Sequence, residues 1–361
     1  MAGQSRKWMI LVATIWIQAF TGTNFDFSTY SSDLKSVLGI SQVQLNYLAV
    51  ASDLGKVFGW SSGLALLYFP LWTVLFAAAI MGFVGYGVQW LVITNVISLP
   101  YILVFLCCLL AGLSICWFNT VCFVLCIRNF PANRSLALSL TVSFNGVSAA
   151  LYTLAYNAIN PISTQLYLLL NALIPLIVSF AALIPIIRQP PLEPLPPDGV
   201  RRDSFMKFYF ARTGWLAVAL FPTTVALFLL ASSGSLSALQ AGTALIGLSS
   251  GFIFAAAVSI TSELFGPNSV GVNHNILITN IPIGSLVYGF LAALVYESHS
   301  TAGSKTGSVI CMGRDCYFLT FVWWGCLSVI GLASSVVLFL RTRRAYQRFE
   351  QDRIASSMLY S

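Results

Sequence analysis

Long apolar stretches dominate the chain and are separated by short polar gaps. A helix needs about 20 apolar residues to cross the hydrocarbon core of a bilayer. The stretches predict ten transmembrane helices, at residues 8–27, 44–68, 71–93, 102–127, 135–158, 165–187, 215–232, 236–262, 270–296 and 317–340. The first stretch is too long for the core of a signal peptide and is predicted to stay as the first span.

The composition supports this interpretation, because 58% of the residues are hydrophobic and only 8% are charged, far from the usage of soluble domains. We therefore expect an all-α polytopic membrane protein in contact with the lipid bilayer.

The positive charges predict the orientation. Lys and Arg gather on the cytosolic side of membrane proteins, and here most of the 18 fall in alternate gaps. If the amino terminus is cytosolic, the cytosolic gaps hold Arg6, Lys7, Arg128, Arg134, Arg188, Arg201, Arg202, Lys207, Arg212, Arg341, Arg343, Arg344, Arg348 and Arg353. Both termini are then cytosolic. The sequence does not say whether the membrane is the plasma membrane or an endomembrane.

One linker divides the chain. Five prolines between residues 190 and 197 are followed by a basic run, and proline at that density disfavours helix. The predicted organisation is a six-helix bundle (1–187), a Pro-rich basic cytosolic linker (188–214), a four-helix part (215–340) and a basic cytosolic tail (341–361).

A faint repeat crosses the linker. Two short cytosolic turns share a charged residue, Phe, Pro and Asn, and each precedes a helix with scattered polar residues. The turns contain Arg128, Phe130, Pro131, Asn133 and Arg134 in the first copy, and Glu263, Phe265, Pro267 and Asn268 in the second. Asn145 and Asn280 are related by the same offset as Asn133 and Asn268. Duplication is one explanation; the preference of any short turn for Pro and Asn is the other.

Longer segments carry a family resemblance. NFDFSTYSSDLKSVLGISQVQLNYLAVASDLGKVFGWSSGL and SICWFNTVCFVLCIRNFPANRS resemble the plant nodulin-like branch of the major facilitator superfamily. FARTGWLA, the segment from ALIGLSSGF to AALVY, and CMGRDCYFLTF are similar to its nuclear-fusion-defective type. The resemblance implies a major-facilitator-like fold and secondary active transport.

The chain departs from that pattern in two respects. Family members have six plus six helices, whereas here only four follow the linker, so the pair that opens the second half is expected to be absent. The turn between the second and third helices of the superfamily commonly carries charges, but here it is GLALLYFPLW. The usual gating ion pair cannot form there.

Ionisable residues inside a span are the leading functional candidates, because a charge there is costly unless it is paired or faces water. Asp53 and Lys56 lie three residues apart in the second predicted span, close enough to share a helical face, and Trp60 lies one turn further on. A proton-coupled or anion-binding site is one interpretation. A self-neutralising pair that serves packing or topology is the other.

Four more polar residues are candidates for the substrate or proton pathway. Asp26 could be protonated during transport or could cap the end of the first span. His274 titrates near neutral pH and could relay protons, or it could be an interfacial histidine. Asn145 and Asn280 could bind a substrate or join helices.

Small residues and cysteines have their own patterns. Gly55, Gly59 and Gly63 recur every four residues, as Gly247 and Gly251 do, and this spacing favours close helix packing. Five cysteines in the fourth span are expected to behave as small apolar residues. Cys311 and Cys316 share a long non-cytosolic gap, where a disulfide could form.

Other functions find no support in the sequence. It has no motif for reading bases, no metal-binding histidine pair, no nucleophile elbow and no phosphate-binding glycine loop, so we expect no nucleic acid partner, metal, cofactor or catalysis. Two functions remain: a secondary transporter of an unidentified small solute, with an anion and proton coupling as options, or a shortened form that does not transport and acts through partners. A ten-helix carrier made of two five-helix repeats also fits the span count, but the six-plus-four division disfavours it.

Overall fold

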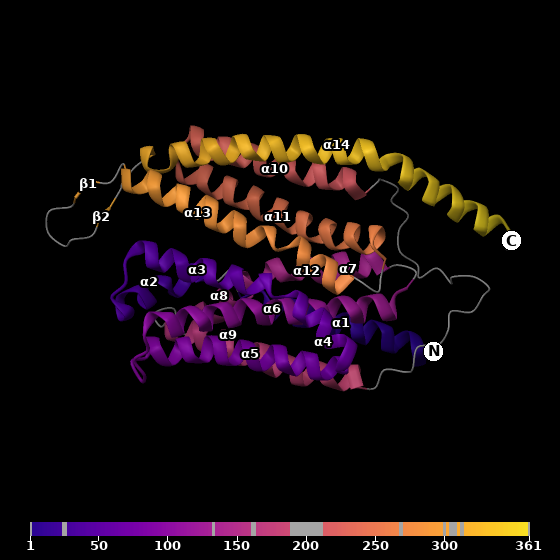
Figure 1. Cartoon of the computed structure of the whole chain (residues 1–361), viewed down its shortest axis with the longest axis horizontal. Helices are drawn as coiled ribbons and strands as arrows, with labels where there is room; N and C mark the ends of the chain where they lie inside the picture. Colours follow the sequence, from indigo (N-terminus) through magenta and orange to yellow (C-terminus); the bar gives the residue numbers. More distant parts are fainter. Residues whose placement is uncertain are drawn as a thin grey trace. The chain divides into compact units, whose positions relative to one another are not determined.

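The computed structural model describes residues 2–23, 27–131, 134–159, 164–187, 212–266, 270–298, 301–302, 309–310 and 314–359. These are almost entirely helical (Figure 1), so the all-α prediction is confirmed. By internal contacts the chain divides into two units, Met1–Glu193 with Thr261–Leu286, and Pro194–Ile260 with Val287–Ser361. The sequence-based division at the linker differs from this one for Thr261–Leu286, which lies in the first unit.

The first unit contains most of the helices. They are α1 (Ala2–Thr21), α2 (Phe27–Leu38), α3 (Gln42–Val57), α4 (Trp60–Tyr68), α5 (Leu71–Ile93), α6 (Tyr101–Asn129), α7 (Arg134–Ser143), the 3₁₀ turn η2 (Phe144–Val147), α8 (Ser148–Ile159), α9 (Thr164–Ile187), α12 (Val270–Leu277) and the beginning of α13 (Asn280–Ser298). The helices α5, α6 and α9 run alongside one another in Figure 1.

Local sequence explains where α3 begins. Ser41 caps the helix: the backbone N–H of Gln44 donates to Ser41 Oγ over 3.2 Å, and the backbone N–H of Ser41 donates to Gln44 Oε1 over 2.9 Å. This reciprocal capping box satisfies two N–H groups that the first helical turn leaves open. It fixes the start of the segment that carries Asp53 and Lys56.

Glycines let α3 and α6 pack backbone against backbone. A Cβ added to Gly112 would overlap the carbonyl of Ser52, and one added to Gly55 would overlap the carbonyl of Leu109. A Cβ added to Gly63 would lie 2.6 Å from Val272 Cγ2. The expected close packing is confirmed for Gly55, Gly59 and Gly63. At Gly247 and Gly251 it is not seen, since nothing in the described part of the chain lies within 4 Å of an added Cβ.

The second unit contains α10 (Arg212–Ser232), α11 (Leu236–Leu264, whose last residues lie in the first unit), the remainder of α13, and α14 (Asp315–Leu359). Two-residue strands β1 (Thr301–Ala302) and β2 (Val309–Ile310) pair antiparallel. Hydroxyl contacts join these helices: Thr223 donates to Ser249 over 2.5 Å, and Thr224 lies 2.7 Å from Ser328. Within the described residues, α14 continues through the basic residues after 340 to Leu359; the cytosolic side of this segment stays a prediction.

Eight helical segments in the described residues are long and apolar enough to cross a membrane. Two of the ten predicted spans are not among them. The helix α1 begins with a polar run that includes Arg6 and Lys7, and the second predicted span is divided into α3 and α4. A multi-pass membrane protein is confirmed, whereas six plus four spans remains a prediction.

Candidate functional site

The second predicted span carries the best-defined polar site. Lys56 Nζ lies 2.6 Å from Asp53 Oδ1, and the Lys56 side chain is 8% exposed against 21% for Asp53. The three-residue spacing in one helix brings the two groups onto the same face. A buried charge without a partner is costly, and in this contact each of the two charges has a partner of opposite sign.

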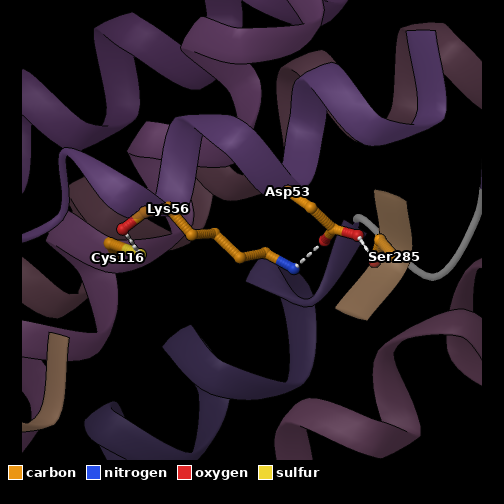
Figure 2. A network of polar contacts seen from close by, with 4 residues as sticks. All are labelled: Asp53, Lys56, Cys116 and Ser285. Carbon is orange, nitrogen blue, oxygen red and sulfur yellow. Dashed lines mark hydrogen bonds and ion pairs between the residues drawn. The ribbon is translucent and has the colours of Figure 1, made fainter. Parts of the chain in front are cut away.

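A distant segment completes the site. Ser285, in the first turns of α13, donates a hydrogen bond from Oγ to Asp53 Oδ2 (Figure 2). The two oxygens of Asp53 therefore have different partners, one on its own helix and one on α13.

The backbone next to Lys56 is held from α6. Cys116 Sγ donates to the carbonyl oxygen of Lys56 over 3.8 Å (Figure 2). A Cβ added to Gly59 would lie 2.8 Å from Cys116 Cβ, so this glycine lets the thiol reach the backbone. The site therefore has partners on α3, α6 and α13.

Trp60 lies beyond an interruption in the span. Phe58 and Gly59 separate α3 from α4, and the Phe58 N–H donates to the Gly55 carbonyl three residues back. Trp60 begins α4 and is 43% exposed. Its place on the path of a solute stays a prediction.

Among the described candidates, neither His274 nor Asn280 makes a hydrogen bond or ion pair with Asp53 or Lys56. His274 is buried in α12, with its ring centroid 5.1 Å from that of Phe123, and its Nδ1 has no hydrogen-bond partner in the described residues. Asn280 is exposed at the first position of α13. Asp26 lies outside the described residues.

Asn145 occupies an interruption of the span formed by α7 and α8. It lies in the 3₁₀ turn η2, and its Oδ1 is buried without a partner among the described residues. Its proposed repeat counterpart, Asn280, follows the turn at Ile278–Thr279 that separates α12 from α13. Both residues of the pair thus lie at breaks in long apolar helices.

The two turns that the charge pattern predicts to be cytosolic differ in burial. Phe130 is 1% exposed and its ring meets that of Trp8 edge to face at 5.7 Å between centroids, whereas Phe265 is 64% exposed. Arg128 is in the last turn of α6, and Arg134 begins α7. Asn133, Pro267 and Asn268 lie outside the described residues, and the Glu263 side chain is not described.

The cysteines fall into three sets, one of which is Cys326, free and exposed on α14. The five in α6 are free, and four of them are buried. Cys316 is buried and disulfide-bonded. Cys311 lies outside the described residues, so its pairing with Cys316 stays a prediction.

Besides Ser285, three polar residues near the site were not predicted from the sequence. Ser62 Oγ lies 2.7 Å from Thr120 Oγ1, and Asn275 Nδ2 reaches both hydroxyls. Serine and threonine are so common in transmembrane helices that neither carries a positional signal. Asn275 was the one residue that the sequence could have singled out, because an amide inside a span needs hydrogen-bond partners.

Comparisons with known proteins cover the whole chain. A family model described as nodulin-like matches residues 7–258, and a model of the NFD4 C-terminal domain matches residues 202–348. Protein NUCLEAR FUSION DEFECTIVE 4 of Arabidopsis thaliana is 48% identical over 540 aligned positions, covering 100% of this chain and 93% of that protein. Probable transporter MCH1 of Yarrowia lipolytica is 34% identical over 94 residues, which are 26% of this chain and 19% of that protein.

The alignment with the Arabidopsis protein is longer than the chain. At least 179 of its positions (540 minus 361) have no residue of this chain. Within the aligned region this chain is therefore shorter than the Arabidopsis protein. Which helices of that protein correspond to the missing positions stays a prediction.

Proposed function

The chain belongs to the nodulin-like family of membrane proteins, and from this premise we propose that it is a secondary active transporter of a small solute that works by alternating access. The Yarrowia relative is described as a probable transporter, which supports the transporter class. The observation that carries the proposal is the Asp53–Lys56 pair with its third partner, Ser285.

The pair suits a coupled transport step. Protonation of Asp53 would remove the negative charge that Lys56 needs as its partner, and the ammonium would then favour an anionic group of the solute. The same protonation would change the contact of Asp53 with α13. One protonation step would in this way alter both solute binding and the contact between two helices.

Transport in proteoliposomes tests this proposal. The purified chain should accumulate labelled anionic solutes when a proton gradient is imposed, and Asp53→Asn and Lys56→Gln should each abolish accumulation. Asp315→Asn is the matched control, because Asp315 is exposed at the start of α14. Absence of flux in the unmodified chain, across a broad panel of solutes and with proton and sodium gradients, would reject the proposal.

The shortened length supports a second candidate function. Alternating access depends on two comparable bundles that move about a central site, and at least 179 aligned positions of the Arabidopsis relative have no counterpart here. In this alternative the chain does not transport and acts by binding a partner membrane protein. Flux by the chain reconstituted alone would exclude it.

A further inference from the structure

In the first unit, two long apolar segments are each interrupted by a two-residue turn. The α3–α4 span breaks at Phe58–Gly59, and the α12–α13 span breaks at Ile278–Thr279. At each break a backbone N–H donates to the carbonyl three residues back: Phe58 to Gly55 over 3.2 Å, and Thr279 to Ile276 over 3.2 Å. The α12–α13 break has a local cause, because Pro282 has no N–H to donate to the carbonyl of Ile278 four residues back. No proline lies near the α3–α4 break, so its surroundings must hold that turn in place.

Two polar contacts join the interrupted segments. Ser285 donates to Asp53, before the α3–α4 break, and Asn275 donates over 3.1 Å to the carbonyl of Gly59, a residue of that break. The order of these contacts along the chain shows that the two segments run antiparallel. The part of α3–α4 that carries Lys56 is thus held at two points by α12–α13.

The amide of Asn275 serves several acceptors. Besides Gly59 O, its Nδ2 lies 3.3 Å from Ser62 Oγ, 3.0 Å from Thr120 Oγ1 and 2.6 Å from Gly271 O. Because an amide nitrogen carries two hydrogens, these acceptors share them. Asn275 is 1% exposed, so water does not compete for the amide. Losing it would leave Gly59 O and the two hydroxyls with partners on α4 and α6 only, and no hydrogen bond to α12.

Close packing fixes the amide in place. A Cβ added to Gly271 would lie 3.0 Å from Thr120 Cγ2, and one added to Gly63 would lie 2.6 Å from Val272 Cγ2. Glycines at a helix contact bring backbones together and strengthen hydrogen bonds between helices. A side chain at either glycine would displace Asn275 from α4 and α6.

A short chain of hydrogen bonds leads from Asn275 to Lys56. The carbonyl of Gly59 accepts from Asn275, and the N–H of Gly59 donates to the carbonyl of Lys56 over 3.0 Å. We propose that Asn275 is a positioning residue for the transport cycle, which holds the interrupted turn of α3–α4 and so sets the orientation of Lys56 toward Asp53. The role of Asn275 in transport rests on the proposed function. Its stabilisation of the turn at Phe58–Gly59 does not.

Hydrogen–deuterium exchange, measured without any solute, tests whether Asn275 stabilises the turn at Phe58–Gly59. In Asn275→Leu the backbone amides from Gly59 to Gly63 should exchange about fivefold faster, the factor that corresponds to one lost net hydrogen bond. Ile276→Ala is the matched control, since Ile276 is the next residue and is 55% exposed. Exchange in Asn275→Leu equal to that in the control would overturn the proposal.

Two variants of Thr120 sharpen the result. Thr120→Val keeps the shape but removes the hydroxyl that Asn275 contacts, and Thr120→Ser keeps the hydroxyl. Faster exchange at Gly59–Gly63 is expected for Thr120→Val alone, and the effects of Thr120→Val and Asn275→Leu should be less than additive because they share one contact. Full additivity would contradict a shared network.

Transport kinetics test the positioning role. In proteoliposomes Asn275→Leu should lower the maximal rate about tenfold and leave the half-saturating solute concentration within about twofold, as expected for a residue that does not touch the solute. A change confined to the half-saturating concentration would overturn the role. If the unmodified chain shows no flux, the proposed function fails, and the exchange result still decides whether Asn275 holds the turn.

Discussion

Ser285 and Asp53 are 232 residues apart in the chain, and the serine hydroxyl donates a hydrogen bond to the aspartate carboxylate. The contact joins α13 to α3 within the first unit. Asp53 therefore connects a charge on one helix, Lys56, with a neutral donor on another. Any change in its protonation is expected to act on both.

Loss of the serine hydroxyl should weaken this connection. Ser285→Ala is expected to lower the free energy of unfolding in mixed detergent micelles by about 2 kcal/mol, because the hydroxyl bonds a charged group. Ser335→Ala is the control, since Ser335 donates to the carbonyl of Gly331 one turn earlier in its own helix. Equal stability of the two variants would show that the Ser285 contact contributes little.

Charge variants separate a structural role of the ion pair from a functional one. Asp53→Asn leaves the nearly buried ammonium of Lys56 without its carboxylate and should cost about 3 kcal/mol of stability. In the double variant Asp53→Asn/Lys56→Gln no unpaired charge remains, so most of that stability should return. Transport should stay absent in the double variant; recovered transport would mean that the pair serves packing alone.

The helices of this chain could be predicted largely from the sequence, because a span in lipid requires a long apolar stretch. The helix α2 was not predicted: its buried residues Tyr30 and Leu34 are four apart, but serines, Asp33 and Lys35 interrupt the apolar pattern. The breaks at Phe58–Gly59 and Phe144–Val147 were also not predicted. They contain no proline and depend on contacts with other helices.

The site could be predicted only in part. Spacing within one helix was enough to pair Asp53 with Lys56, and the structure has that contact. Ser285 and Asn275 could not be assigned, since their partners Asp53 and Gly59 lie more than 200 residues away and only the packing of α12 and α13 in the first unit brings them together. The proposed repeat relates Asn145 to Asn280, and both lie at helix breaks, which local sequence alone does not mark.

The distribution of charge predicts which termini are accessible. Epitope tags at residues 1 and 361 should bind antibody after digitonin opens only the plasma membrane, because the basic gaps are predicted to be cytosolic. A tag inserted between residues 302 and 309 should bind antibody on intact cells if the protein is in the plasma membrane. If the protein is in an internal membrane, the tag should bind only after that membrane is opened. If the terminal tags stay protected after digitonin treatment, the predicted orientation is wrong.

Two glycines give a matched test of helix packing. A methyl group at Gly112 would overlap the backbone of Ser52 and separate α6 from α3, whereas nothing in the described residues lies within 4 Å of a Cβ added to Gly87 on α5. Gly112→Ala should therefore lower the free energy of unfolding by about 3 kcal/mol, while Gly87→Ala should leave it unchanged or raise it by up to about 1 kcal/mol through helix propensity. Because α3 carries Asp53 and Lys56, Gly112→Ala should also reduce any flux. Equal stability of the two variants would mean that α3 and α6 do not pack backbone against backbone in the membrane.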